Sequence, residues 1–260
     1  MDLIYDNRGI QLFCGDNLQL LTLMEPNSVD MIFADPPYNI SNGGTSCSGG
    51  ERVSVDKAGW DKSQGVMEDY KGHLEWIQAS RRVLKPSGTI WITGSYHSIY
   101  QCGMAVQLSG FHILNDISWF KPNAPPNLGC RCFTASHESL IWARKDKKAK
   151  HTFNYLDMKN GDWHEQDDIK KDGKQMRSVW RIPATNQAEK RQGKHPTQKP
   201  IALLDRIVLS STNEGDLIVD PFLGSGTTAK SAQKHNRLFV GCDLEIGYVE
   251  LSQRRCEEEG

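Results

Sequence analysis

The sequence predicts an α/β fold in which a mainly parallel sheet carries helices on both faces. Short apolar runs alternate with segments of helical periodicity along most of the 260 residues, and this alternation is typical of such sheets. Some runs are apolar at nearly every position, as residues 29–34 (VDMIFA) are, which indicates strands buried on both faces. A chain of this length accommodates one such domain with an insertion.

The first half of the chain predicts strands and helices in alternation. Turn residues separate them, among them Gly15-Asp16-Asn17 after the first strand and Pro86-Ser87-Gly88 before the third. Residues 41–66 are rich in Gly and Ser and lack periodicity, so we expect a loop at the active site there. The expected strands cover residues 9–14, 29–34, 89–93 and 111–120, and the expected helices cover residues 18–24, 68–84 and 98–108.

Periodicity is lost at Lys121 and returns near Lys199. The intervening residues 121–194 hold several prolines and many charges, and we interpret them as a region inserted in the core, although residues 140–143 also fit a core strand. The chain is thus divided into core halves 1–120 and 195–260 around the insertion. The second half predicts helices at 201–211, after the turn to residue 234 and from 246, and strands at 217–220 and 237–242.

The composition is that of an ordinary globular protein, with 38% hydrophobic and 24% charged residues. No apolar run reaches the length of a membrane span, and residues 1–6 lack the features of a signal peptide. The seven cysteines are scattered and form no CxxC pair. We therefore expect a cytoplasmic protein with reduced thiols, no membrane association and no metal site.

Positive charge is concentrated in residues 143–199, which hold 15 Lys and Arg against 8 Asp and Glu, whereas the whole chain has a net charge of −1. A basic segment on an acidic body suggests an anionic partner such as a nucleic acid. We expect contacts with phosphates from the lysines of this segment, although charge alone leaves a solvated loop equally open. The basic residues of this segment whose neutralisation should weaken DNA binding include Lys145, Lys147, Lys148 and Lys150.

Residues 217–228 (LIVDPFLGSGTT) read as a strand, a glycine-rich turn and a helix. Gly224 and Gly226 allow a tight turn and a close approach of the backbone to a ligand. An acid, Asp243, ends the next strand and suits the hydroxyls of a ribose. The turn has no Gly-Lys-Ser/Thr and no basic residue, so a cofactor with an adenosine and no phosphates fits best. The alternative is a turn that needs a positive φ.

Two further motifs carry chemistry. Asp35-Pro36-Pro37-Tyr38 follows a buried strand, where open α/β sheets bind ligands. A carboxylate, a carbonyl fixed by prolines and an aromatic face suit a planar base that bears an amino group, although a simple turn is equally open.

His195-Pro196-Thr197-Gln198-Lys199-Pro200 opens a helix, whose N-terminus suits a carboxylate. Simple helix initiation is the alternative there.

In this order, the three motifs resemble those of the β-group of amino-methylating DNA methyltransferases, in which the catalytic motif precedes the cofactor motif. The resemblance covers nearly the whole chain. It implies the class I methyltransferase fold, permuted, with a mixed seven-stranded sheet that has one antiparallel strand. It also implies S-adenosylmethionine as the methyl donor, DNA as the substrate, and residues 121–194 as the target-recognition region.

The resemblance also implies the roles of individual residues. Residues 35–38 would act on the base, and Asp35 would also border the cofactor. Asp16 would read the adenine of the cofactor, Asp243 or nearby Glu245 would hold its ribose, and Thr197 and Lys199 would lie near its methionine end. The remaining residues expected to line the cofactor are Asp220, Phe222, Gly224, Ser225, Gly226 and Thr227.

The expected reaction is transfer of a methyl group to the exocyclic amino group of a flipped base. If Asp35 and the Pro36 carbonyl accept the two amino hydrogens, the nitrogen lone pair can point at the methyl group. The base must leave the duplex to reach the pocket, where Tyr38 would stack on it. The loop 41–66, with Lys57, Trp60 and Lys62, would close over the DNA.

Several alternatives stay open at this point. Asp35 at the first motif position favours adenine N6 by resemblance, and cytosine N4 is the alternative within the class. An RNA or small-molecule methyltransferase and a non-catalytic DNA-binding module are alternatives from other classes. The resemblance also raises a homodimer and a cognate restriction endonuclease as partners.

Overall fold

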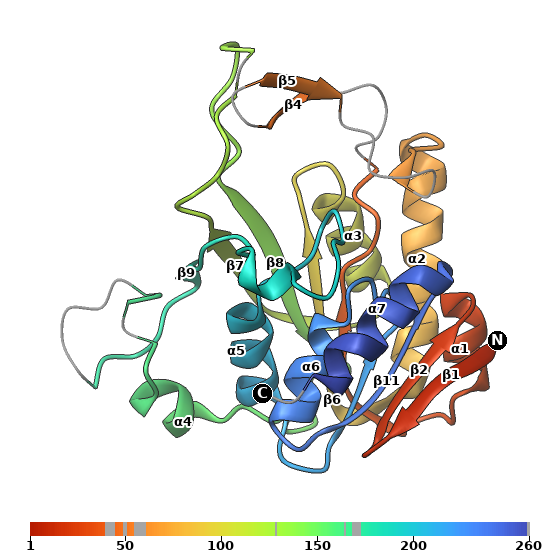
Figure 1. The fold of residues 1–260 in the computed structure, drawn as a ribbon. Coiled ribbons are helices and arrows are strands. Elements are labelled where there is room, and N and C mark those ends of the chain that lie inside the picture. The colour runs from red at the N-terminus through yellow and green to blue at the C-terminus, as the bar shows by residue number, and fades with distance from the viewer. Residues whose placement is uncertain are drawn as a thin grey trace.

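The computed structural model describes residues 1–39, 45–48, 51–54, 61–127, 129–163, 165–167 and 173–258, with only the backbone of residues 45–48 and 51–54. Within these residues one large twisted sheet forms the centre of the molecule (Figure 1) and confirms the expected α/β class. In spatial order its strands are β1 (Asp2–Asn7), β2 (Ile10–Cys14), β11 (Leu238–Asp243), β10 (Leu217–Asp220), β3 (Val29–Ala34), β6 (Leu84–Gly94), β8 (His137–Arg144), β7 (His112–Phe120) and β9 (Val179–Arg181).

The direction of the strands is that expected of the class I methyltransferase fold. The five strands from β2 to β6 run parallel to one another. β8 lies antiparallel between β6 and β7. The strands from β2 to β7 are therefore the mixed seven-stranded sheet with one antiparallel strand. β1 and β9 extend it at its two edges.

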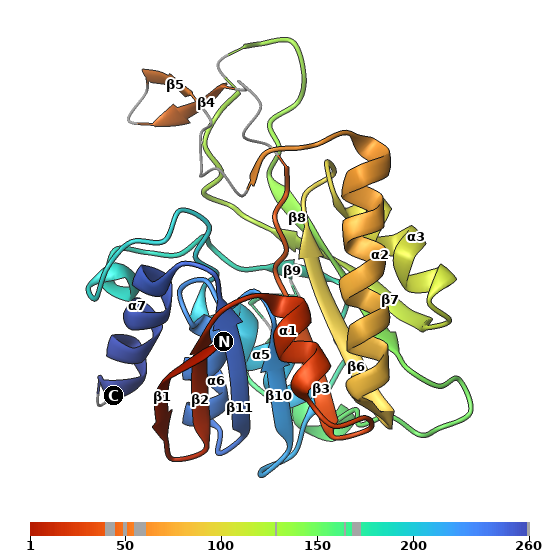
Figure 2. The same ribbon diagram turned by 90° about the vertical axis from the view of Figure 1, so that its right-hand side faces the viewer.

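Helices cover both faces of the sheet (Figure 2). Side chains alternate along each central strand, so that Met31 and Phe33 of β3 face one core while Ile32 and Ala34 face the other. This double burial explains why the strand is apolar throughout. Helices α1 (Asn17–Leu23), α2 (Val66–Val83) and α3 (Ile99–Leu108) cover one face, α5 (Ile201–Ser211), α6 (Thr227–Lys234) and α7 (Ile246–Glu257) cover the other, and α4 (Tyr155–Asn160) packs against α5.

Two strands depart from the sequence prediction for local reasons. β1 is not predicted because polar residues such as Asp2 and Asp6 interrupt its pattern, as an edge strand permits. β6 begins at Leu84 and not near residue 89, so it runs through Pro86. The register shifts between the Val29–Leu84 pair and the next pair of strand residues, and such an irregularity tolerates a proline inside a strand.

One part of the region 121–194 belongs to the core, and another part projects from it. β8 lies in this region, and its apolar residues 140–143 are buried in the sheet, which agrees with the core strand that the sequence left open. The described part of residues 121–136 projects as an arm beyond the carboxyl end of β7 (Figures 1 and 2). It lies on the same side of the molecule as the hairpin of β4 (Thr45–Ser48) and β5 (Glu51–Ser54). Within the expected loop 41–66 this hairpin is an element that the sequence does not predict, and Lys57 and Trp60 lie outside the described residues.

The lysines of residues 145–150 lie at the end of the sheet where the parallel strands begin, opposite the end where those strands finish. They follow β8, which is antiparallel and therefore ends where its neighbours begin. Lys145 Nζ donates to the Leu84 carbonyl at 2.5 Å and to Asn27 Oδ1 at 2.7 Å, at the starts of β6 and β3. The expected phosphate contacts of this lysine cluster therefore cannot be made at the edge where the carboxyl ends of the parallel strands converge.

Candidate active site

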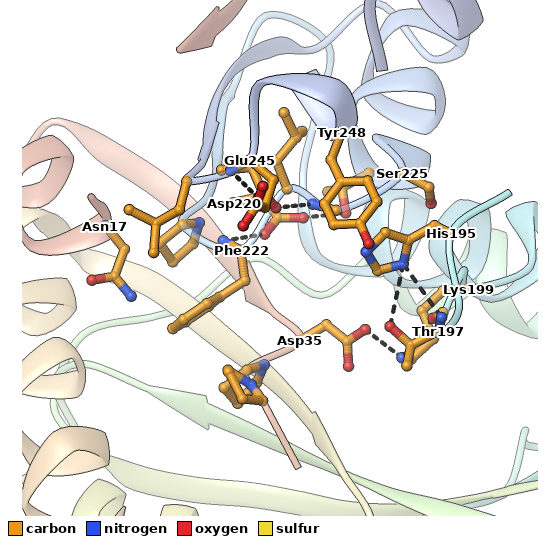
Figure 3. Close-up of a pocket in the computed structure, with 18 of the residues that line it drawn as sticks. Asn17, Asp35, His195, Thr197, Lys199, Asp220, Phe222, Ser225, Glu245 and Tyr248 are labelled. Atoms are coloured by element: carbon orange, nitrogen blue, oxygen red, sulfur yellow. Dashed lines mark hydrogen bonds and ion pairs between the residues drawn. The ribbon is translucent and has the colours of Figure 1, made fainter. Parts of the chain in front are cut away.

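Four neighbouring parallel strands end in aspartates at one edge of the sheet. Asp16 follows β2, Asp243 ends β11, Asp220 ends β10 and Asp35 follows β3. All four line a single pocket, which Figure 3 shows in close-up. The catalytic and cofactor motifs, which stand at opposite ends of the sequence, thus meet at the edge where open α/β sheets bind ligands.

Nearly all of the residues expected at the site line this pocket. They come from the turn after β2, the segment after β3, the loop before α5, the turn after β10 and the end of β11 with the residues that follow it. Gly226 is the exception. The expected residues that line the pocket are Asp16, Asp35, Pro36, Pro37, Tyr38, Thr197, Lys199, Asp220, Phe222, Gly224, Ser225, Thr227, Asp243 and Glu245.

Gly224 brings its backbone against the pocket wall. Its φ is +51°, and its N–H donates to Asp243 Oδ2 at 2.9 Å. A Cβ at this position would lie 3.2 Å from the His195 ring. A glycine is therefore required both by the backbone conformation and by the space.

Gly226 faces helix α7 and not the pocket. Its φ is +70°, and a Cβ built on it would lie 2.5 Å from the Ser252 side chain. The turn can approach α7 this closely only because the residue is a glycine. The structure thus corrects the expectation that Gly226 lines the cofactor pocket, and gives it a packing role next to the pocket.

Arg255 of α7 holds the turn in place, although nothing in the sequence singled it out. Its buried guanidinium donates to the Ser225 carbonyl at 2.6 Å and to Thr227 Oγ1 at 2.9 Å. The Thr227 hydroxyl in turn donates to the Lys199 carbonyl at 3.0 Å. The turn after β10 and the loop before α5 are therefore joined by one hydrogen-bonded network.

Asp220 is almost completely buried and is bonded within its own turn. Its Oδ1 accepts the Phe222 N–H at 2.9 Å, and its Oδ2 accepts the Thr228 hydroxyl at 2.7 Å. Burial raises the pKa of this carboxyl to about 7, although both hydrogen bonds lower it. The carboxyl of Asp220 is thus poised to titrate near neutral pH.

The other acids of the cofactor side have different surroundings. Asp243 accepts the N–H groups of Gly224 and Glu245, and burial raises its pKa despite these bonds. Glu245 is exposed at the rim, at the N-terminus of α7. Asp16 caps α1, with Oδ1 accepting the Leu18 N–H at 2.9 Å. Asp16 therefore has a structural role in addition to its place in the pocket wall.

Asp35 is surrounded by hydrogen-bond donors on the base side of the pocket. Its Oδ1 accepts the Tyr38 hydroxyl at 2.8 Å and the Thr93 hydroxyl at 2.5 Å. Its Oδ2 is in contact with the ammonium of Lys199, whose side chain is 6% exposed. The structure thus links the first motif to the His195–Pro200 motif through a buried ion pair, as Figure 3 shows.

Tyr38 has a buried ring and two carboxylates near its hydroxyl. The hydroxyl lies 2.8 Å from Asp35 Oδ1 and 2.9 Å from Glu138 Oε2. Burial, together with the charges of these two acids, raises the pKa of the phenol well above its ordinary value. Tyr38 therefore remains a protonated donor. The Lys199 Nζ lies 5.2 Å from the centre of the ring, near the aromatic surface on which the base is expected to stack.

The sequence analysis missed several residues of the site. His195 Nδ1 accepts the Thr197 N–H at 3.3 Å, and the ring of His195 meets that of Tyr248 edge-on at 4.3 Å. Tyr248 belongs to α7, and Thr93 and Glu138 come from strands without a motif. The positions of Tyr248, Thr93 and Glu138 depend on tertiary pairing, and only His195 gave a signal, as the first residue of its motif.

The donor set of the pocket fits S-adenosylmethionine. Among the described residues that line it, acidic side chains outnumber basic ones, which are Lys199 and His195. An acidic pocket suits a ligand with a sulfonium, an ammonium and a ribose diol, and opposes a pyrophosphate. Phe222, Leu223 and Leu244 supply apolar surface for an adenine ring. The acids of the pocket are Asp16, Asp35, Asp61, Asp220, Asp243 and Glu245.

Comparison with known families agrees with this fold. A family model described as DNA methylase matches residues 29–254. The chain belongs to this family and is therefore a DNA methyltransferase that uses S-adenosylmethionine as methyl donor. Two curated relatives share 50% identity with it. They are the type II methyltransferase M2.DpnII of Streptococcus pneumoniae, over 98% of this chain and 92% of the relative, and M2.LlaDCHI of Lactococcus lactis subsp. cremoris, over 96% and 90%.

Solved structures resemble nearly the whole chain. The complex of M1.HpyAVI with S-adenosylmethionine has a TM-score of 0.68 and 25% identity, and the match covers 96% of this chain and all of that one. The cytosine-N4-specific PvuII DNA methyltransferase has a TM-score of 0.73 over 98% of this chain and 88% of that one, and at 18% identity it shows the fold alone. Among the described residues, no helix is long and apolar enough to cross a membrane.

Proposed function

We propose that this protein transfers a methyl group from S-adenosylmethionine to the N6 amino group of adenine in DNA, as the modification enzyme of a restriction-modification system. The observation that carries the proposal is the position of Asp35 and Tyr38 at the end of β3, in the same pocket as the turn after β10. A base that enters this pocket would bring its amino group beside the cofactor. The names of the type II methyltransferase relatives support the restriction-modification context.

The residues on the base side would bind and orient the amino group. The Asp35 carboxylate and the Pro36 carbonyl would accept its two hydrogens, so that the nitrogen lone pair is free for in-line attack. The bound cofactor supplies an electrophilic methyl group on a sulfonium. As the nitrogen becomes positively charged, the Asp35 carboxylate would stabilise it. Thr93, which bonds Asp35 at 2.5 Å, would fix the orientation of that carboxylate.

The choice of adenine rests on the first residue of the motif. Asp35 is the acid found in the adenine-methylating members that the chain resembles, and the physics of the pocket serves either base. Methylation of the amino group of cytosine is therefore the outcome that would overturn this part of the proposal. Recognition of the target sequence would come from residues 121–194, and the described part of residues 121–136 projects from the core on the same side of the molecule as the β4–β5 hairpin (Figure 2).

The partners and the location extend this proposal. A cognate restriction endonuclease would act on the same DNA site. The protein would form a homodimer, as is common in the group that the chain resembles. A cytoplasmic location would fit an enzyme whose substrate is DNA. The scattered cysteines also favour a reducing compartment.

Substitution of Asp35 separates the two halves of the proposed site. Asp35→Ala should lower methyl transfer by about a thousandfold or more, an order expected when a group that acts on the transition state is removed. The affinity for S-adenosylmethionine, measured by calorimetry, should change little, because Asp35 acts on the base. A variant within about tenfold of the wild-type rate would contradict the role of Asp35.

A further inference from the structure

Lys199 stands in the place that the proposed function assigns to the base. Its ammonium is paired with Asp35 Oδ2 and lies 5.2 Å from the centre of the Tyr38 ring. These two groups, the carboxylate and the aromatic face, are the ones that should receive the amino group and the ring of the base. The Lys199 side chain must therefore adjust when the base enters.

Glu138 offers the ammonium a second partner. Its Oε2 lies 3.9 Å from Lys199 Nζ and 2.9 Å from the Tyr38 hydroxyl, while its Oε1 pairs with Lys121. Burial raises the pKa of Glu138, but the charges of Lys199 and Lys121 outweigh burial and the net shift is downward. Glu138 is thus an ionised carboxylate close to the same ammonium.

The charge that develops during the reaction disfavours an ammonium at Asp35. The amino nitrogen would form a bond to the methyl carbon as the carbon–sulfur bond breaks and its electron pair stays on sulfur. Positive charge would then lie on the nitrogen until one amino hydrogen leaves as a proton to the Asp35 carboxylate or to solvent. A neighbouring ammonium would raise the energy of that state, whereas an unpaired Asp35 would lower it. Removing the ammonium from every carboxylate would leave a buried charge without a partner, which is costly.

We propose that Glu138 takes over the Lys199 ammonium when the amino group of the base binds Asp35. Glu138 is then a positioning residue that frees Asp35 for the base and keeps Lys199 paired. This inference rests on the proposed function of Asp35. The competing arrangement leaves Lys199 on Asp35, since Oδ2 has a second lone pair that an amino hydrogen could use.

The test compares rates of methyl transfer in a single turnover, with DNA and S-adenosylmethionine both saturating, in the variants Glu138→Gln, Lys199→Met and the double variant. E138Q keeps a hydrogen-bond acceptor for Tyr38 but loses the charge. We expect its rate to fall by about tenfold or more, with cofactor affinity within about threefold of the wild type. Glu68→Gln, which neutralises a carboxylate of the exposed Lys71 pair, is the matched control and should keep the wild-type rate.

The double variant tells the proposed role from a structural one. Without the Lys199 ammonium there is nothing to take over, so E138Q should change the rate of the K199M protein by less than about twofold. An undiminished effect of E138Q in that background, or an E138Q rate near that of the wild type, would overturn the proposal. If E138Q loses cofactor affinity, Glu138→Asp decides, because it keeps the charge and should restore most of the rate; equal loss in both variants would refute the role of the charge.

This outcome is separable from that of the proposed function. The proposed function fails if Asp35→Ala stays active or if the wild-type product is not methylated adenine. Neither result depends on Glu138. Suppose that the wild type yields methylated adenine and that E138Q lowers the rate equally in the wild-type and K199M proteins. That result would reject only the proposal that Glu138 takes over the ammonium.

Discussion

The four aspartates at the pocket edge differ through their partners. Asp16 caps a helix, Asp35 is paired with Lys199, Asp220 is bonded inside its turn and Asp243 accepts backbone N–H groups. Each acid could be found in the sequence, because each follows an apolar run. Their surroundings could not, since Lys199 and Asp35 are brought together only by the order of the strands.

The raised pKa of Asp220 predicts a pH-dependent stability. The folded state holds this proton up to a pKa of about 7, whereas the ordinary value is 3.8. Between these values the folded state binds more protons than the unfolded state, so this residue makes the protein less stable as pH rises through that window. Asp220→Asn removes the effect. The free energy of unfolding of the variant minus that of the wild type should therefore rise from pH 4 to pH 7.

Denaturant unfolding at several pH values measures this difference. The upper bound is about 4 kcal/mol, which corresponds to a shift of roughly three pKa units. The lost hydrogen bonds of Asp220 add a constant offset that does not vary with pH. A difference between the two proteins that stays flat from pH 4 to pH 8 would show that Asp220 titrates normally in the folded state.

At the scale of elements, the turn after β10 is fixed by its contact with α7. Gly226→Ala should destabilise the protein, because its φ of +70° is strained for alanine and the new Cβ would lie 2.5 Å from Ser252. We expect a loss of about 1–3 kcal/mol in the free energy of unfolding. Gly247→Ala is the matched control, since a Cβ there meets nothing within 4 Å. Equal stability of the two variants would remove the packing role of Gly226.

Most elements of the core could be predicted because their signals are local. β3 and β10 begin and end where the apolar runs 29–34 and 217–220 do. β1 and β9 are edge strands of mixed polarity, so only pairing with a neighbour defines them. β8 lies in a polar region and joins the core through contacts with two distant strands. The motif residues of the site were predictable for the same local reason, and Glu138, Thr93 and Arg255 were not.

At the scale of the whole molecule, the two edges of the sheet have different roles. The pocket opens at the carboxyl edge of the parallel strands, and the lysines of residues 145–150 lie at the other edge. Another group of basic residues precedes His195, which lines the pocket, on a segment that packs against α7 at Gly193 and Leu251. Contacts with DNA phosphates are therefore expected from Lys190, Arg191 and Lys194.

The salt dependence of DNA binding tests this assignment. The triple variant K190A/R191A/K194A should flatten the slope of log affinity against log salt by about two to three, since each lost phosphate contact contributes roughly 0.9. The triple variant K147A/K148A/K150A removes the same charge at the far edge and should leave the slope unchanged. The reverse pattern would place the DNA on the other side of the molecule.

The central claim is that the pocket with Asp35 methylates the amino group of adenine in DNA. Its most direct test is nucleoside analysis by mass spectrometry of DNA incubated with the protein and S-adenosylmethionine carrying a labelled methyl group. We predict labelled N6-methyladenine from the wild type and none from Asp35→Ala. Labelled N4-methylcytosine as the main product would contradict the choice of base, and labelled N6-methyladenine from both proteins would contradict the role of the pocket.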